Sequence, residues 1–388
     1  MNNVKIFAQQ TSWIEGEAIR QLNEAGGLPG MISVFGMPDA HPSKGCAVGA
    51  VSISSNIIYP HLIGNDIGCG YSLFETDIPS KRLHPDKLAE KLRGLDSEYI
   101  GAEARLESYG LLTDYVAGLG TVGGGNHFAE LQRVVNVTDS AAFNALGIDT
   151  TRLVLLVHSG SRGLGESIFQ KFAALCGNRG FQHTDEHYQQ YITAHDNAVQ
   201  WAAVSREIIA ERLLNCLNTT GRRIIDLPHN FVEINNNQLI HRKGAAPSDR
   251  GISPLPGSRG TSTYLLNPSA SDESSRSLAH GAGRKTSRAN MHGKFQQSTK
   301  QLINNNLGGV VVCGNSILLE EEHPSAYKNV DKVLDDLKAY DLALDIAELH
   351  PVITYKSEPL SRRSDISSKR EKEEGWRTVR RDSVKRRV

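Results

Sequence analysis

The sequence predicts an α+β fold in which mixed sheets and surrounding helices form one large domain over residues 1–356. Short apolar runs separated by glycine and polar residues are typical of strands joined by tight loops. Helical stretches fall between these runs without the regular strand–helix alternation of a doubly wound parallel sheet. The 388 residues are enough to bury a large hydrophobic core around such sheets.

Hydrophobic periodicity gives the expected elements in order. The stretches expected to be helical are 15–25, 86–117, 166–176, 185–217 and 330–337. The apolar runs that predict strands are 32–35, 48–53, 56–59, 152–157, 239–242, 263–266 and 310–313. The run 152–157 is nearly continuous, which predicts a buried strand that ends at His158. The serine-rich stretch 269–277 is expected to be a loop.

The charge of the chain is balanced, since 43 Lys and Arg accompany 43 Asp and Glu. Net charge therefore excludes no class of partner. Residues 357–388 depart from this balance with eleven basic and six acidic residues. We expect this segment to be a basic C-terminal tail, separate from the domain.

No stretch approaches the roughly 18 apolar residues that a membrane-spanning helix needs. Residues 1–5 hold no apolar leader segment. The five cysteines are scattered along the chain and odd in number, which does not fit a disulfide framework. We therefore expect a cytoplasmic protein without membrane contact.

The segment His280-Gly281-Ala282-Gly283-Arg284 carries the strongest chemical signal. Its glycines let backbone N–H groups approach an anion, and its arginine offers a charged fork for phosphate. An imidazole in that setting can attack phosphorus and hold it covalently. We therefore expect His280 to be a catalytic nucleophile.

Thiol, imidazole and carboxylate groups recur upstream of this segment, most of them next to glycine. The candidate metal ligands are Asp66, Cys69, His127, His158 and His229. Five ligands suffice for two metal ions if one or two of them bridge. A lone histidine or cysteine is more often structural, but core packing does not need the glycine that surrounds most of these. The set therefore indicates a metal-dependent nucleotidyl-transfer site.

The remaining histidines and cysteines of interest are interpreted as structural. The histidines expected at the surface are His84, His183, His187, His195, His292 and His350. The cysteines expected to pack in the core are Cys46, Cys176, Cys216 and Cys313.

Nine segments in this order resemble the RtcB family of RNA ligases. They are Met37-Pro38-Asp39-x-His41-x-x-Lys44-Gly45, Asp66-Ile67-Gly68-Cys69-Gly70, Gly125-Asn126-His127-Phe128-x-Glu130, His158-Ser159-Gly160-Ser161-Arg162-Gly163, His229-Asn230, Arg242-Lys243-Gly244-Ala245, Pro256-Gly257-Ser258, His280-Gly281-Ala282-Gly283-Arg284 and Ala326-Tyr327-Lys328. Each segment alone is a weak signal, but all nine in order are specific. They span roughly residues 30–356.

The resemblance implies a reaction and two cofactors. Members of the family join an RNA 3′-phosphate or 2′,3′-cyclic phosphate to a 5′-hydroxyl, using GTP and two Mn²⁺ ions. By the match, His280 would attack the α-phosphate of GTP and carry GMP as a phosphoramidate. GMP would then pass to the RNA 3′-phosphate, and the 5′-hydroxyl would displace it. The implied partners are such RNA ends and GTP, with an activating protein as a further candidate, and the implied process is RNA repair.

The resemblance also implies roles for particular residues. Manganese would be held by the five candidate metal ligands. Asn126 and the backbone at Gly281 would face phosphate oxygens, and Glu130 and Lys356 would contact guanine, on which Tyr327 would stack. The remaining residues implied in nucleotide binding are Phe128, His229, Asn230, Pro256, Gly257, Ser258, Arg259, Thr263, Ala282 and Gly283.

This chain departs from the family pattern in four places. The stretch between Cys69 and Asn126 is shorter than in typical members, Arg259 stands where methionine is usual, and Thr263 replaces a serine. Family members also end close to the position of Lys356, whereas this chain continues to Val388. The added basic pairs around Trp376 could bind RNA, or the tail could simply be solvated.

Two other functions remain open from the sequence. A metal-dependent phosphoesterase that opens cyclic phosphates would need the metal ligands but neither GTP nor His280. A non-catalytic RNA-binding relative would be expected to have lost ligands, yet all five and His280 are present.

Overall fold

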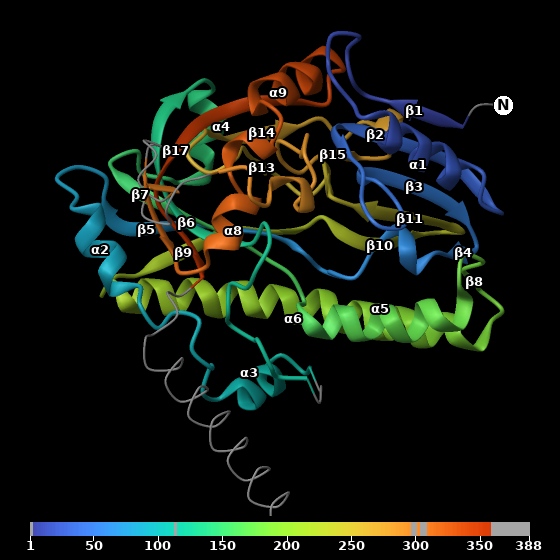
Figure 1. Cartoon of the computed structure of the whole chain (residues 1–388), viewed down its shortest axis with the longest axis horizontal. Coiled ribbons are helices and arrows are strands. Elements are labelled where there is room, and N and C mark those ends of the chain that lie inside the picture. The colour runs from blue at the N-terminus through green and yellow to red at the C-terminus, as the bar shows by residue number, and fades with distance from the viewer. Residues whose placement is uncertain (1–2, 112–114, 296–300, 303–308, 358–388) are drawn as a thin grey trace, which may run out of the picture.

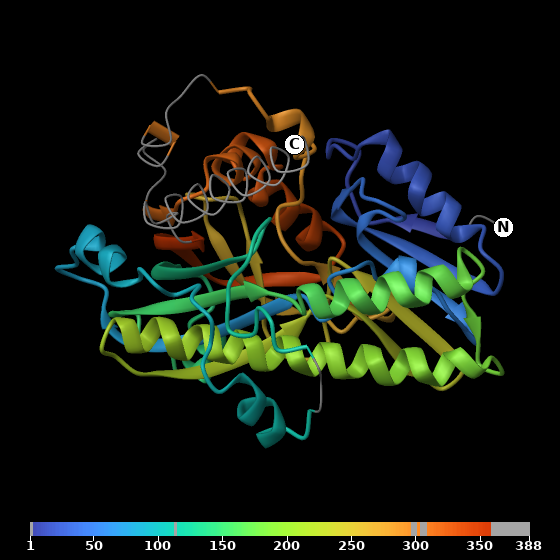
Figure 2. The same cartoon turned by 60° about the horizontal axis from the view of Figure 1, so that its bottom comes forward.

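The computed structural model describes residues 3–111, 115–295, 301–302 and 309–357. Two sheets lie side by side along the long axis of the molecule (Figure 1). Helices α5 (Gly163–Cys176) and α6 (Glu186–Cys216) run beneath them, and α6 extends along much of the molecule (Figure 2). Helices and sheets are thus combined without strand–helix repetition, which confirms the expected α+β class.

The larger sheet has eight strands among the described residues, in the order β13-β14-β17-β6-β7-β5-β9 with β16 beside β17. Only the β16–β17 pair is parallel. The strands are β5 (Gly70–Pro79), β6 (Phe128–Val137), β7 (Arg152–Ser159), β9 (Gly221–Pro228), β13 (Ser253–Pro256), β14 (Thr263–Pro268), β16 (Val310–Cys313) and β17 (Ala343–Ser357).

The smaller sheet has the order β1-β2-β3-β11-β10, and two further strand pairs are β12–β15 and β4–β8. These strands are β1 (Val4–Ile6), β2 (Met31–His41), β3 (Val48–Ser55), β4 (Ile57–Ile58), β8 (Phe181–Gln182), β10 (Asn230–Asn235), β11 (Gln238–Lys243), β12 (Ala245–Pro247) and β15 (Ser277–Ala279). The shorter helices are α1 (Gly16–Gly26), α2 (Pro85–Lys91), α3 (Ala102–Ser108), α4 (Ser140–Leu146), α8 (Ser316–Glu321) and α9 (Val330–Ala339).

The apolar run in β7 is continuous because both faces of the larger sheet are covered. Leu153, Leu155 and Val157 pack on one face, in a core that includes residues of α6. Val154 and Leu156 pack on the other face with residues of α4 and β14. Successive side chains of a strand point to opposite faces, so burial of both faces requires an apolar residue at every position.

Most expected elements are confirmed, but the single helix expected over 86–117 is wrong. The chain instead forms the short helices α2 and α3. Gly94 and Gly101 lie between them with φ values of 90° and 88°, a conformation that ends an α-helix. Leu92, Leu95 and Leu111 of the helical pattern are nevertheless buried, because the connecting turns direct them into the core.

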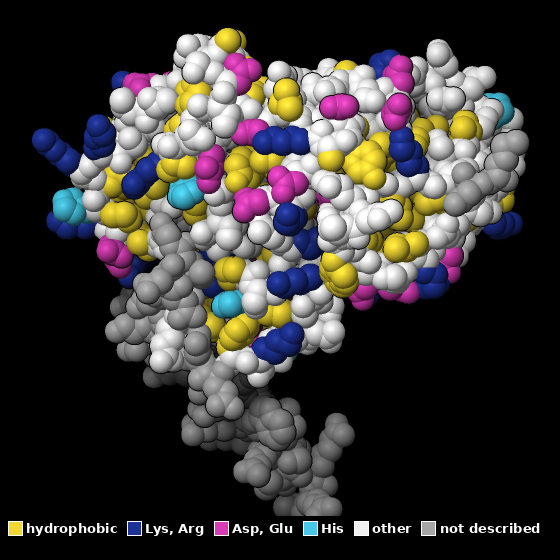
Figure 3. Space-filling view, turned by 90° about the horizontal axis from the view of Figure 1, so that it is seen from above, with side chains coloured by type: hydrophobic (Ala, Val, Ile, Leu, Met, Phe, Trp, Pro, Cys, Tyr) yellow, Lys and Arg dark blue, Asp and Glu magenta, His cyan; other side chains and the backbone are white. Residues whose placement is uncertain are grey.

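The last described strand, β17, ends at Ser357. The basic tail expected over residues 357–388 therefore lies almost entirely outside the described residues. On the face shown in Figure 3, lysine and arginine side chains are scattered among acidic ones rather than gathered in one field. Within the described ranges, no helix combines the length and apolar character needed to cross a membrane.

Candidate active site and metal centre

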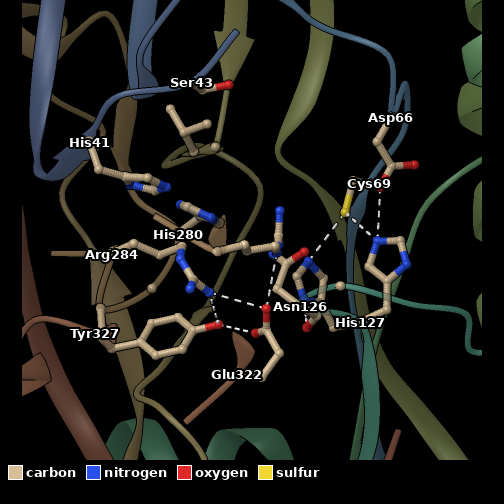
Figure 4. Close-up of a pocket in the computed structure, with 18 of the residues that line it drawn as sticks. His41, Ser43, Asp66, Cys69, Asn126, His127, His280, Arg284, Glu322 and Tyr327 are labelled. Atoms are coloured by element: carbon tan, nitrogen blue, oxygen red, sulfur yellow. Dashed lines mark hydrogen bonds and ion pairs between the residues drawn. The ribbon is translucent and has the colours of Figure 1, made fainter. Parts of the chain in front are cut away.

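A cavity of about 1570 Å³ lies where the two sheets meet the loop after β15. All the residues that the sequence singled out for catalysis, nucleotide binding or metal binding line this cavity. Figure 4 shows several of them converging from different elements. Residues that span positions 66 to 356 of the sequence thus line one cavity.

Four of the candidate metal ligands meet because they stand at the ends of four adjacent antiparallel strands, β6, β7, β5 and β9. These strand ends lie at the same end of the larger sheet. Cys69 precedes β5 and His127 precedes β6, whereas His158 is near the end of β7 and His229 follows β9. The register pairs Gly70 with both Ser159 and Pro228. Neighbouring antiparallel strands run in opposite directions, so two strand starts lie beside two strand ends.

The ligand atoms are close enough to share metal ions. The Cys69 Sγ lies 3.4 Å from His127 Nε2 and 3.2 Å from His158 Nε2, and His158 Nε2 lies 3.3 Å from His229 Nε2. Asp66 Oδ2 lies 2.8 Å from His127 Nε2. These atoms form two groups of three, and Cys69 belongs to both. A thiolate shared by the groups is suited to bridge two cations.

Hydrogen bonds fix the orientation of His158. Its Nδ1–H donates a hydrogen bond to the Asn126 carbonyl oxygen over 3.1 Å, so Nε2 is the unprotonated nitrogen that faces Cys69. A ligating histidine is commonly oriented in this way. Lys356 donates from Nζ to the His127 carbonyl oxygen over 3.1 Å and so secures the neighbouring ligand segment.

Burial prepares the histidines as neutral ligands. Burial, and then the charge of neighbouring histidines, lowers the pKa of His158 and His229 well below the usual range. Burial and the nearby Asp66 carboxylate raise the pKa of the Cys69 thiol. The Nδ1 atoms of His127 and His229 are buried without a hydrogen-bond partner among the described residues. A cation would offset the repulsion among these groups, and their N, O and S donors fit a transition metal.

Arg206 of α6 braces the strand ends that carry the ligands. This fully buried side chain forms a two-pronged ion pair with Asp226, with N–O distances of 2.7 and 2.8 Å. Its Nη1 donates to the carbonyl oxygens of Gly68 and Ser159 over 2.7 and 2.9 Å. One guanidinium thus ties together the Cys69 loop, β7 and β9.

His280 lies beside this centre and is held by a buried carboxylate. Its Nδ1 donates to Asp39 Oδ2 over 2.6 Å, and its backbone N–H contacts the same oxygen at 3.3 Å. The rings of His280 and His229 have centroids 4.7 Å apart. Because Nδ1 carries the shared proton, Nε2 keeps its lone pair available for attack.

Gly283 allows the His280 loop to approach Asp39. Gly283 has a φ of 72°, and a Cβ there would lie 2.1 Å from the Asp39 carbonyl oxygen. A larger residue would therefore push the loop away from the carboxylate. His41 also lines the cavity, and its Nδ1 lies 2.9 Å from the Asp39 carbonyl oxygen.

Arg284 does not offer its fork to the cavity as the sequence analysis expected. Its Nη1 donates to Glu322 and to the Tyr327 hydroxyl at 3.1 and 3.2 Å, and its Nη2 donates to the Glu321 carbonyl oxygen at 2.7 Å. Its guanidinium also lies 4.9 Å from the centre of the Tyr327 ring. Arg284 therefore orders the wall of the cavity rather than presenting a free phosphate clamp.

Glu322 is the centre of that wall and is 3% exposed. It accepts from Arg284 and from Arg288, each at 3.1 Å, and from the Tyr327 hydroxyl. Burial alone would raise the pKa of Glu322, but the charges of Lys356, Arg288 and Arg284 hold it below the usual value. This part of the cavity therefore contains a stable carboxylate among cations.

A second carboxyl group that lines the cavity, that of Glu130, lies on β6. It accepts from Gln132 Nε2 at 2.7 Å and from the Thr354 hydroxyl, and Gln132 also donates to Thr263 over 2.8 Å. Burial raises the pKa of Glu130.

Asn230 is also engaged within the protein, since it accepts from Gly244 N at 2.7 Å and donates to the Asp66 carbonyl oxygen at 3.1 Å.

The surface position expected for His195 is wrong. His195 is 1% exposed, and its Nε2 accepts the Val232 N–H at 3.0 Å. It is buried because one face of α6 packs under β10. Its neighbours in the sequence are polar, so the sequence alone does not reveal this environment. His183 precedes α6 and is exposed, and His187 is half-buried. His84, His292 and His350 are exposed as expected.

Sequence reasoning missed the roles of Asp39, Glu322 and Arg206. Asp39 stands in a noted motif, but its partner is 241 positions away and no spacing connects them. Arg206 lies in α6 and Glu322 directly follows α8, and neither has a neighbouring glycine, which was the signal used to choose candidates. The four other cysteines pack as expected: Cys46, Cys176 and Cys313 are buried and Cys216 is partly buried.

The sequence is similar to one family of known proteins over most of its length. The family model described as tRNA-splicing ligase RtcB matches residues 21–103 and 101–357. An RNA-splicing ligase RtcB2 of Escherichia coli is 40% identical over 359 residues, covering 90% of this chain and 95% of that protein.

Relatives with lower sequence identity also match most of this chain. The RNA-splicing ligase RtcB of Mycobacterium tuberculosis is 26% identical over 425 residues, covering 84% of this chain and 97% of the relative. The tRNA-splicing ligase RtcB of Methanococcus maripaludis is 24% identical over 438 residues, covering 87% and 91%.

Proposed function

The chain belongs to the RtcB family of RNA ligases, and on that premise we propose that it joins RNA ends through a histidine–GMP intermediate. Its substrates would be an RNA 3′-phosphate or 2′,3′-cyclic phosphate and a 5′-hydroxyl, and it would use GTP and Mn²⁺. The observation that carries the proposal is His280, whose Nδ1 is held by Asp39 and whose ring lies 4.7 Å from that of His229.

Asp66, Cys69, His127, His158 and His229 would hold two manganese ions, because their ligand atoms form two groups that share Cys69. Bound there, the ions would neutralise phosphate oxygens next to His280 and help align them. The site requires Cys69 as a free thiol, which fits a reducing compartment such as the cytoplasm.

His280 performs the first step in this account. Its Nε2 forms a bond to the α-phosphorus of GTP, the bond from that phosphorus to the bridging oxygen breaks, and pyrophosphate leaves. Asp39 keeps the proton of the imidazole on Nδ1 and stabilises the positive charge that develops on the ring.

Two further displacements complete the ligation. An oxygen of the RNA 3′-phosphate attacks the phosphorus of the GMP group, which breaks the P–N bond and frees His280. The 5′-hydroxyl oxygen then attacks the RNA phosphorus, loses its proton, and GMP leaves. A 2′,3′-cyclic end is first hydrolysed to the 3′-phosphate. The RNA 3′-phosphate must be activated by GMP, because attack on the unactivated phosphate would have to expel oxide, which is a poor leaving group.

The nucleotide would lie between His280 and the wall formed by Glu322 and Tyr327. Asn126 and the backbone at Gly281 would face phosphate oxygens. Glu130 and Lys356 would contact the guanine base, since both are buried in the cavity wall. The other proposed nucleotide contacts are Phe128, His229, Asn230, Pro256, Gly257, Ser258, Arg259, Thr263, Ala282, Gly283 and Tyr327.

Ligation of two labelled RNA strands tests the proposed function. One strand ends in a 3′-phosphate or 2′,3′-cyclic phosphate and the other begins with a 5′-hydroxyl. We expect joining that requires GTP and Mn²⁺ with the native chain and no joining with His280→Ala. Opening of the cyclic phosphate by both proteins, without joining by either, would instead indicate a phosphoesterase. A requirement for added cell extract would indicate an activating protein.

A further inference from the structure

Arg259 is a buried cation on a turn whose other residues are all more exposed. The turn joins β13 to β14 and is closed by hydrogen bonds from Gly257 N to Ser262 O at 2.9 Å and from Thr261 N to Ser258 O at 2.9 Å. An arginine on such a turn would ordinarily extend into water. Arg259 instead is 8% exposed and lines the cavity.

The guanidinium of Arg259 has unused hydrogen-bonding capacity. Its Nη2 donates to the Leu302 carbonyl oxygen at 3.3 Å. Its Nε and Nη1 are buried without a partner among the described residues. Nη2 carries two hydrogens and uses one, so a second Nη2 hydrogen remains beside either Nε or Nη1. One edge of the guanidinium thus keeps two parallel donors free, and buried donors of this kind are normally satisfied by some partner.

The surroundings of Arg259 place it at the end of the cavity expected to hold the base. Burial lowers the pKa of Arg259, and the groups that oppose this effect are Cys313, Glu322 and Tyr327. The charge of Arg259 in turn contributes to the lowered pKa of Lys356, whose main cause is burial. Glu322 already pairs with Arg284 and Arg288, so Arg259 keeps its free donors for a ligand in the cavity, where Lys356 is expected to contact the guanine base.

We propose that Arg259 reads the Hoogsteen edge of guanine, donating two hydrogen bonds to O6 and N7 of the base. This inference rests on the proposed use of GTP. Paired O6 and N7 acceptors match an arginine fork, and adenine presents an amino donor in place of O6. The methionine usual at this position in the family cannot donate, so Arg259 gives this chain an added preference for guanine over adenine.

Equilibrium binding of GMP and 7-deaza-GMP tests the inference without requiring catalysis. The second nucleotide has C–H in place of N7 and cannot accept the second hydrogen bond. We expect the native chain to bind 7-deaza-GMP about tenfold more weakly than GMP in calorimetry, the cost typical of an impaired bidentate contact. Arg259→Met should bind GMP more weakly than the native chain does and should bind the two nucleotides equally.

Arg259→Lys serves as the matched control, because it keeps the positive charge but loses the planar fork. If Arg259 only neutralises phosphate, the native chain will bind both nucleotides equally and Arg259→Lys will bind GMP as the native chain does. That result would overturn the inference while leaving the proposed function intact. If the native chain binds no GMP with metal present, the proposed function and the inference both fail. Equal binding of the two nucleotides by the native chain overturns the inference even if a variant does not fold.

Discussion

His280 and Asp39 lie 241 positions apart in the sequence, yet a 2.6 Å hydrogen bond joins His280 Nδ1 to Asp39 Oδ2. The carboxylate has no exposed surface, and His280 is 8% exposed. This pair determines which imidazole nitrogen is free to react. It also joins β2 of the smaller sheet to the loop after β15, so the geometry of the proposed nucleophile depends on how the two segments pack.

Asp39→Asn should slow guanylylation by about a hundredfold or more, because an amide cannot stabilise the imidazolium and can favour the wrong tautomer. The rate of GMP transfer to the protein, measured in a single turnover, checks this. Mn²⁺ affinity measured by calorimetry should stay close to native, since Asp39 is not a proposed ligand. A native rate of GMP transfer in Asp39→Asn would contradict the assigned role.

Metal affinity should increase with pH between about 6 and 8, by up to about tenfold per unit if one proton is released. Burial and Asp66 raise the pKa of Cys69, so the thiol must lose a proton when a metal binds. Burial lowers the pKa of His158 and His229, so these ligands are already neutral. Cys69→Ala should weaken Mn²⁺ binding and flatten the pH dependence. An unchanged slope in this variant would show that the proton comes from another group.

Arg206→Met should destabilise the fold by about 3 kcal/mol, because it leaves the partly buried Asp226 carboxylate without its ion-pair partner. Urea unfolding at neutral pH measures the loss. Arg93→Met is the matched control, since the Arg93–Glu90 pair is exposed and should contribute less than about 1 kcal/mol. Equal losses in the two variants would contradict the bracing role of Arg206.

The same pair predicts a pH dependence of stability. Burial alone would raise the pKa of Asp226, but the Arg206 guanidinium holds it below the usual value. The stabilisation is therefore fully present above the pKa of an unfolded aspartate, and it is lost as the pH falls through the lower folded value. Below that range, Arg206→Met should lose less stability relative to the native chain than it does at neutral pH.

Zn²⁺ should bind more tightly than Mn²⁺ but inhibit ligation. Cysteine and histidine donors favour zinc, which is satisfied by four ligands and leaves fewer positions for phosphate oxygens. Competition calorimetry and ligation assays with each metal alone check the two parts of this prediction. Rapid ligation with Zn²⁺ as the sole metal would refute it.

Deletion of residues 358–388 should weaken RNA binding and reduce its salt dependence if the basic tail contacts RNA phosphates. RNA affinity measured over a series of salt concentrations distinguishes the alternatives, because each lost phosphate contact lowers the slope. The same salt slope in the full and shortened chains would mean that the tail is only solvated.

The sequence was informative wherever a residue's environment follows from its neighbours. The run 152–157 predicted a strand because burial on both faces leaves no polar position. The candidate metal ligands were singled out because glycine next to a thiol or imidazole has no packing purpose, and the structure brings their ligand atoms together. The 86–117 prediction failed because leucines remain at helical spacing even though Gly94 and Gly101 break the helix.

Pairings between distant segments could not be predicted from the sequence. The contact of His280 with Asp39 depends on the approach of two loops, and the engagement of Arg284 with Glu322 depends on how α8 packs. His195 was misplaced for the same reason, since only the position of β10 over α6 makes it buried. Spacing rules describe neighbours along an element, whereas these contacts join different elements.

Covalent labelling of the protein tests the central claim most directly. The native chain and His280→Ala are incubated with α-³²P-GTP and Mn²⁺, separated on a denaturing gel, and the labelled peptide is mapped. The account predicts an acid-labile, alkali-stable label on the native chain alone, located at His280. Absence of label on metal-loaded native protein, or equal labelling of His280→Ala, would contradict it.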